Sequence, residues 1–188
     1  MSRAAIAPYS ERWPDAFLAV AKRIRDALGP AALRIDHIGS TAVPGLPAKN
    51  VIDVQVAVAD LGAADALAAA GFRPCERIAV DHCPPGNDGS AEQWTKRLFT
   101  EADGERRANV HVRVEGRANQ RYALLFRDYL RTHPQTAEAY AELKRRLAAH
   151  MPDTATYADV KDPAVDLIAL AAEDWAAATG WQPGPSDA

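Results

Sequence analysis

The chain has 188 residues and a net charge of −3. A chain of this length forms one domain whose core needs no disulfides, and a net negative charge disfavours a general nucleic-acid-binding protein. The first ten residues lack the build of a signal peptide, and no apolar run approaches a membrane span. We therefore expect a soluble cytoplasmic protein that binds neither nucleic acid nor membrane.

The N-terminal part predicts a helix followed by two strands. The helix begins near Ser10, a suitable N-cap, carries apolar residues at helical spacing, and ends at Gly29. A short apolar strand follows over 35–38. After a loop, a strand over 51–58 is rich in β-branched residues and too short for an ordinary helix.

After residue 60 we expect a short helix and three further strands, and the chain becomes helical after residue 115. Asp60 is the expected N-cap of a short helix over 61–70. The later expected elements are strands over 72–80, 94–100 and 108–115, with a turn at 102–104, and helices over 119–132, 136–149 and 164–179. Strands that precede helices in this way predict an α+β fold around a mixed sheet.

Residues 181–188 are rich in Pro, Gly and Ser, which predicts a flexible tail. No internal repeat and no linker divides the preceding part, so we expect residues 1–180 to form a single domain.

One carboxylate, Asp53, interrupts the apolar strand over 51–58. Because side chains alternate along a strand, Asp53 and Gln55 share one face, while Ile52, Val54 and Val56 share the other. A buried carboxylate is costly unless it is paired, hydrogen-bonded or bound to a cation. The strand therefore predicts a polar site within a core strand.

The residues around this strand resemble a known family. The segment His37-Ile38-Gly39-Ser40-Thr41-Ala42-Val43-Pro44-Gly45-Leu46, with the later Ala48-Lys49 and Ile52-Asp53, is similar to the signature of the GrpB-like proteins, which are grouped with the nucleotidyltransferase superfamily. The segments 110–112 and 125–131 resemble the family in the same order. The resemblance implies a nucleotidyltransferase-like mixed sheet with flanking helices and a helical C-terminal part.

The loop over 81–86 and the segment 161–163 are most similar to GrpB-like domains that are fused to actinobacterial dephospho-CoA kinases. The chain has no Gly-x-x-x-x-Gly-Lys-Ser/Thr pattern, so it is not itself such a kinase.

In active members of the superfamily, a Gly-Ser pair after the first core strand contacts nucleotide phosphate. The resemblance assigns this role to Gly39 and Ser40, with Thr41 beside them. A glycine lets backbone N–H groups approach an anion, a serine hydroxyl adds a donor, and Lys49 adds charge. The alternative for the pair is an ordinary turn between two elements.

Asp53 matches the first of two superfamily carboxylates that hold magnesium. Gln55 occupies the second position, and an amide brings no charge to Mg²⁺ or Mn²⁺. Glu115 is a candidate replacement, and a single ion on Asp53 is another solution. The alternative for Asp53 is a structural carboxylate that is hydrogen-bonded to loop amides or paired with Lys49.

Two histidines and three cations complete the predicted site. His37 and His111 lie in expected strands, and the roles of general base, phosphate donor and metal ligand are open for them. We expect Asp53 and His111 to face one cleft and to be the catalytic pair. Lys96, Arg97 and Arg113 are candidate ligands of phosphate or carboxylate, whereas the run 144–146 predicts a solvated helix face.

Two functions follow from these residues. The first is a nucleotidyltransferase-like protein that binds a nucleotide or a phosphorylated small molecule and transfers it with Mg²⁺. The second is a non-catalytic anion-binding or regulatory module that keeps the pocket. Gln55 separates them, because a second acid at that position is what metal-dependent transfer requires.

Overall fold

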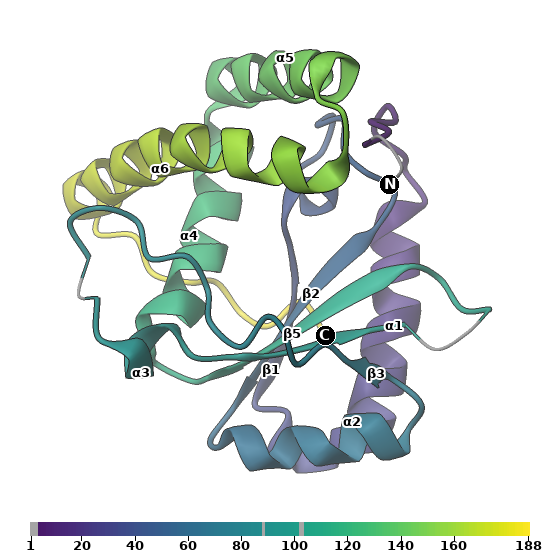
Figure 1. Ribbon diagram of the computed structural model, residues 1–188. Helices are drawn as coiled ribbons and strands as arrows, with labels where there is room; N and C mark the ends of the chain where they lie inside the picture. Colours follow the sequence, from purple (N-terminus) through teal and green to yellow (C-terminus); the bar gives the residue numbers. More distant parts are fainter. Residues whose placement is uncertain (1–3, 88, 102–103) are drawn as a thin grey trace.

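The structure, a computed structural model, describes residues 4–87, 89–101 and 104–188. Within them, five strands form one mixed sheet in the order β1-β2-β5-β4-β3 (Figure 1). The strands are β1 (Arg34–Ile38), β2 (Ile52–Val58), β3 (Arg73–Pro74), β4 (Arg97–Thr100) and β5 (Ala108–Val114). β2 and β5 run parallel, and the other neighbouring pairs are antiparallel.

One face of the sheet is apolar and lies against α1 (Trp13–Leu28) and α2 (Asp65–Ala69). Side chains of β2 at alternate positions, Ile52, Val54 and Val56, are fully buried there with Phe17 and Ile24 of α1. Removing such side chains from water supplies most of the stabilisation of a core, at roughly 25 cal/mol per Å² of apolar surface.

The opposite face carries the polar residues of β2 and is covered by α4 (Ala118–Thr132). α5 (Pro134–His150) and α6 (Thr154–Thr179) pack beyond α4 and form the helical part of the molecule (Figure 1). A second core cluster joins these helices to the β1–β2 loop through Val43 and Leu46. The predicted α+β fold, with its mixed sheet, flanking helices and helical C-terminal part, is confirmed.

The boundaries predicted for several elements were wrong. The strand expected over 72–80 is reduced to β3 and an isolated bridge between Val80 and Thr95. Trp94 ends a short helix, α3 (Ala91–Trp94), rather than starting a strand. The expected turn at 102–104 lies mostly outside the described residues.

α6 begins ten residues earlier than predicted, because Asp153 caps it and its carboxylate accepts hydrogen bonds from the N–H groups of Ala155 and Thr156. Pro163 lies inside this helix instead of preceding it. A proline removes one backbone donor from a helix interior, and tertiary contacts have outweighed that cost here.

Residues 181–188 leave α6, cross α4 and reach β1, where residues 184–188 make the contacts described below (Figure 1). Their flexibility and the single-domain assignment of residues 1–180 stay predictions. Among the described residues, every helix is too short or too polar to cross a membrane.

Candidate functional site

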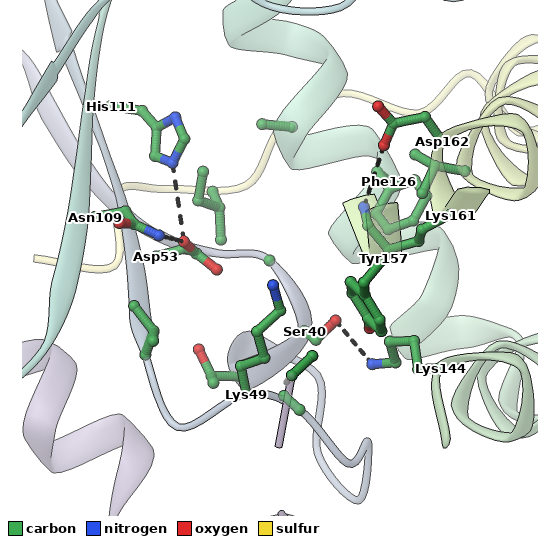
Figure 2. Close-up of a pocket in the computed structure, with 18 of the residues that line it drawn as sticks. Ser40, Lys49, Asp53, Asn109, His111, Phe126, Lys144, Tyr157, Lys161 and Asp162 are labelled. Carbon is green, nitrogen blue, oxygen red and sulfur yellow. Dashed lines mark hydrogen bonds and ion pairs between the residues drawn. The ribbon is translucent and has the colours of Figure 1, made fainter. Parts of the chain in front are cut away.

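A pocket of about 770 Å³ lies between the polar face of the sheet and the helical part. Figure 2 shows two sides of it, with Lys49 extending between them. We call Asp53, Asn109 and His111 the strand wall, since they come from β2 and β5. We call Lys49, Lys144 and Lys161 the cationic wall, since they come from the β1–β2 loop, α5 and α6.

The strand wall is built by the register of β2 and β5. Asp53 is opposite Asn109, and Gln55 is opposite His111, so these side chains emerge from the same face. Asn109 Nδ2 donates a hydrogen bond of 2.8 Å to Asp53 Oδ1, and His111 Nε2 lies 3.8 Å from the same oxygen. Asp53 and His111 therefore face one cleft, as side-chain alternation predicts.

Gly39 is needed for this arrangement. It follows directly after β1 with a φ of 69°, and a Cβ at this position would lie 2.6 Å from Asp53 Oδ2. An L side chain would suffer both strain from the positive φ and a clash with the carboxylate. The glycine of the Gly-Ser pair thus serves the packing of Asp53 as well as the shape of the loop.

His111 is a neutral hydrogen-bond donor in this structure. Burial and the nearby charges of Arg113 and Lys96 lower its pKa to about 4 despite the opposing effect of Asp53. The Lys96 ammonium, which can only donate, lies 3.2 Å from His111 Nδ1. The single ring proton therefore resides on Nε2, the nitrogen nearer Asp53, and this nitrogen is not a proton acceptor in this state.

Asp53 is an ionised carboxylate. Burial raises its pKa, but His111 and Asn109 stabilise the charge and the pKa is lowered overall. Carboxylates grouped to hold a divalent cation repel each other in its absence and have raised pKa values. Asp53 shows the opposite, because hydrogen bonds from His111 and Asn109 stabilise its ionised form.

The residues around Asp53 do not fit a two-carboxylate magnesium site. The Gln55 side chain is buried and engaged at both ends: Oε1 accepts a hydrogen bond of 2.6 Å from Arg113, and Nε2 donates to Gln120 O. Glu115 lies past the end of β5, six residues beyond the partner of Asp53, and this places it about 20 Å away. The described residues contain no cluster of three or more potential His, Cys, Asp or Glu ligands.

Asp81 is a polar residue of the pocket that the sequence analysis did not place in the site. It reaches in from the loop before α3, and Arg113 binds it through Nε at 2.8 Å and Nη2 at 2.9 Å. Lys96 Nζ donates to the same carboxylate at 2.5 Å. Two of the predicted phosphate ligands are thus paired with a nearly buried acid.

Four of the predicted site residues lie outside the pocket lining: Lys96, Glu115, Arg97 and His37. Arg97 pairs with Asp65 on the opposite side of the sheet. His37 is buried on the α1 face, where its ring stacks on Phe17 at 4.8 Å and its Nε2 lies 2.9 Å from Thr41 Oγ1. Burial lowers its pKa to about 4, so it is a neutral packing residue that positions the Thr41 hydroxyl.

Lys144 is on the cationic wall, and the prediction of a solvated face was wrong for it. Its side chain is 3% exposed, whereas Arg145 and Arg146 pair with Glu142 at the surface as expected. Lys144 Nζ donates to Ser40 Oγ at 2.9 Å and to Pro47 O at 2.6 Å, and it lies 4.6 Å from the centre of the Tyr140 ring.

No described carboxylate forms an ion pair with Lys144. Burial is the main cause that lowers its pKa to about 7, and the nearby charges of Lys161 and Arg145 add to the shift. The sequence held a weak signal that Lys144 is buried, because it lies three positions from both Ala141 and Leu147 and so shares their buried helix face.

The two other lysines of the cationic wall complete the positive region. Lys49 Nζ lies 4.6 Å from the centre of the Tyr157 ring, and burial together with Lys161 lowers its pKa. Lys161 is 3.5 Å from its neighbour Asp162. Ser40 and Lys49 of the β1–β2 loop thus come together with Lys144 of α5, which lies 104 positions after Ser40. Thr41 lines the pocket beside them.

Comparison with known proteins identifies similar chains. The family model described as GrpB protein matches residues 3–170. A dephospho-CoA kinase of Mycolicibacterium paratuberculosis is 38% identical over 95% of this chain. The match covers 48% of that relative, so the chain spans about half the length of the kinases it resembles.

Two solved structures are also similar. The conserved protein GrpB from Enterococcus faecalis superposes with a TM-score of 0.72 at 30% identity, covering 91% of this chain and 99% of that one. Cid1, in complex with its short product ApU, has a TM-score of 0.46 at 16% identity, covering 74% of this chain and 40% of the other.

Proposed function

This chain belongs to the GrpB family and has an α+β fold around a mixed sheet, and we propose that its pocket binds a nucleotide or another phosphorylated small molecule. The observation that carries the proposal is Lys144. A buried ammonium that faces a pocket and has neutral partners among the described residues is an incomplete arrangement.

A phosphate bound beside Lys144 would supply the negative charge that its described partners lack. Burying a cation without a counter-ion is costly, and a bound anion removes that cost. Ser40 Oγ accepts a hydrogen bond from Lys144 and is also hydrogen-bonded to the Tyr140 side chain. A hydroxyl both donates and accepts, so with Tyr140 as the donor in that pair, the Ser40 proton would turn to a phosphate oxygen. Lys49 and Lys161 add charge from the two neighbouring elements.

The strand wall would hold the uncharged part of the ligand. The ionised Asp53 accepts hydrogen bonds, and His111 Nε2–H donates them. A sugar hydroxyl matches this pair of groups, because it can donate to the carboxylate and accept from the imidazole.

Metal-dependent transfer is the second candidate, and the presence of Asp53 in the pocket favours it. The engaged Gln55 and the distant Glu115 leave Asp53 without a second carboxylate. We therefore place binding without transfer first. The kinase activity named for the longer relatives adds dephospho-CoA and CoA to the ligands to be tested.

The test is a thermal-shift panel followed by calorimetry. Inorganic phosphate, nucleotides, dephospho-CoA and CoA are titrated in EDTA and then in Mg²⁺ or Mn²⁺, with wild type, Ser40→Ala and Asp53→Asn. A ligand that binds the native state raises the melting temperature. We expect binding in EDTA that weakens by about tenfold in Ser40→Ala, the worth of one hydrogen bond to a charged group.

The panel also separates the two candidates. Binding that requires Mn²⁺ and disappears in Asp53→Asn would replace the first candidate by the second. If no phosphorylated ligand in the panel binds with or without metal, both candidates fail.

A further inference from the structure

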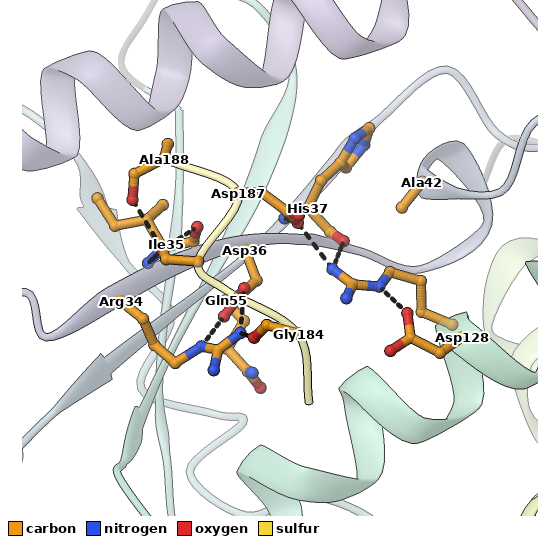
Figure 3. A network of polar contacts seen from close by, with 12 residues as sticks. Arg34, Ile35, Asp36, His37, Ala42, Gln55, Asp128, Gly184, Asp187 and Ala188 are labelled. Atoms are coloured by element: carbon orange, nitrogen blue, oxygen red, sulfur yellow. Dashed lines mark hydrogen bonds and ion pairs between the residues drawn. The ribbon is translucent and has the colours of Figure 1, made fainter. Parts of the chain in front are cut away.

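The outer edge of β1 is an interaction surface. One side of β1 pairs with β2, and β1 ends the strand order, so the backbone groups on its other side face no further strand within the described part of the chain. Exposed edges of this kind are templates for pairing with another extended segment. In this molecule, residues 184–188 lie along the edge (Figure 3).

The segment satisfies the edge mainly through two polar side chains. Ile35 N donates to Ser186 Oγ at 2.8 Å, and His37 N donates to Asp187 Oδ2 at 2.9 Å. Ala188 N in turn donates to Ile35 O at 3.1 Å. Ser186 and Asp187 therefore take the place that backbone carbonyl groups of a neighbouring strand would occupy.

Arginines from three elements contact the segment. Arg25 of α1 donates to Ala188 O at 3.1 Å. Arg34 of β1 donates to Gly184 O at 3.1 Å, and Arg127 of α4 donates to Asp187 Oδ2 at 2.7 Å. Arg127 is 3% exposed, and its other carboxylate partner, Asp128, also lies 3.6 Å from Arg131. Asp187 thus supplies the second negative charge for two arginines that otherwise share one acid.

Arg127 and Arg131 also bind the loop over 39–42, which contains the Gly-Ser pair. Arg127 Nη1 donates to His37 O at 3.0 Å, just before Gly39, and Arg131 Nε donates to Ala42 O at 2.9 Å, at the end of the loop. A change in the charge balance of this pair acts on both ends of the loop that carries Ser40.

We propose that the edge of β1 is a docking site for an extended acidic segment containing Ser-Asp, occupied here by the chain's own residues 184–188, and that docking holds the 39–42 loop in place. The recognition chemistry is a carboxylate on a buried guanidinium combined with pairing to a strand edge. The proposal does not depend on what the pocket binds.

Hydrogen exchange tests the docking in the intact chain. Asp187→Asn keeps the shape of the side chain but removes the charge that Arg127 binds. We expect the amides of Ile35 and His37 to exchange about tenfold faster or more, since a hydrogen bond to a charged group is lost. Exchange over 39–42 should rise as well. Asp174→Asn, the same change at an exposed position of α6, is the control.

A peptide supplies the second arm. A chain shortened after residue 183 should bind a peptide of residues 181–188, and the same peptide with the Asp187→Asn change should bind at least about tenfold more weakly. If the shortened chain does not fold, the peptide is added to Asp187→Asn in the full chain, where it should restore protection at Ile35 and His37.

Three results would overturn the proposal. They are unchanged exchange at Ile35 and His37 in Asp187→Asn, equal binding of the two peptides, and no restored protection by the peptide. Phosphate binding is not used as a readout in either arm, so these results are independent of the proposed function.

Discussion

The two walls of the pocket differ in how their charges are compensated. On the strand wall, Asp53 is bound by Asn109 and lies beside His111, and behind it Asp81 binds both Arg113 and Lys96. On the cationic wall, Lys144 and Lys49 lie on aromatic rings, and Lys144 bonds neutral oxygen atoms.

This difference indicates which wall binds the charged part of a ligand. A network whose charges are internally paired is a source of rigidity, and its members lose stability when one is removed. A buried cation without a carboxylate partner is destabilised in its charged form, and a bound anion stabilises that form. The comparison assigns ligand charge to the cationic wall and positioning to the strand wall, and it can be tested by changing each wall separately.

The largest effect is expected at Asp81, as a loss of stability. Asp81→Asn removes the anion that pairs with Arg113 and Lys96, and breaking a buried ion pair costs about 3–5 kcal/mol. Urea unfolding measures this loss. Asp65→Asn removes an acid whose side chain is 80% exposed and should cost less than about 1 kcal/mol. Similar losses in the two variants would contradict a tightly coupled ion-pair network behind the strand wall.

The same variant should change the acid sensitivity of the protein. Burial raises the pKa of Asp81, but Arg113 and Lys96 lower it overall below the ordinary value. A carboxyl with a lowered pKa contributes stability above its unfolded-state pKa of about 4, and this contribution is lost as pH falls. Asp81→Asn should therefore lose less stability than wild type between about pH 4 and pH 2.

Lys144→Met should weaken anion binding by about tenfold to a hundredfold, the worth of a charge-assisted hydrogen bond. The empty protein should become more stable by about 0.5–2 kcal/mol, because a destabilised functional charge is replaced by an apolar side chain. Calorimetry and melting curves measure the two effects. Lys22→Met, at an exposed lysine paired with Asp26, is the control. A large loss of stability without a loss of affinity would show that Lys144 is structural.

Sulfate binding should weaken as pH rises through about 7. Lys144 has a lowered pKa of about 7, so its charged fraction falls about tenfold between pH 6 and pH 8. Sulfate keeps its two charges over this range, which leaves the protein as the group that titrates. Calorimetric titrations at several pH values should show up to about a tenfold loss in wild type and a flatter profile in Lys144→Met. A flat profile in wild type would contradict the prediction.

Gln55→Glu should have the smallest effect on metal binding. It restores the acid pair in sequence, but the new carboxylate would meet Arg113, which already donates to Gln55 Oε1. We expect no measurable gain in Mn²⁺ affinity by calorimetry, with Asp53→Asn as the comparison. Tight Mn²⁺ binding by Gln55→Glu would show that the strand wall can reorganise around a metal ion.

Local patterns in the sequence determined the two strands over 51–58 and 108–115, which carry the strand wall of the site. Alternation along 51–58 grouped Asp53 with Gln55, and alternation along 108–115 grouped His111 with Arg113, because parity within a strand is independent of distant contacts. The β2–β5 register then placed the two groups on one face. The Gly-Ser motif and the family followed from residues that are adjacent in the chain.

Tertiary structure alone decided which charges are compensated. Asp81 meets Arg113 across 32 positions, and Lys144 meets Ser40 across 104, so no periodic pattern connects them. His37 faces α1 because the antiparallel register places it opposite Val54, on the face away from Asp53. Residues 184–188 reach β1 across about 150 positions. Spacing reports only neighbours within an element, whereas pairing between elements depends on register and packing, and these are fixed by the whole fold.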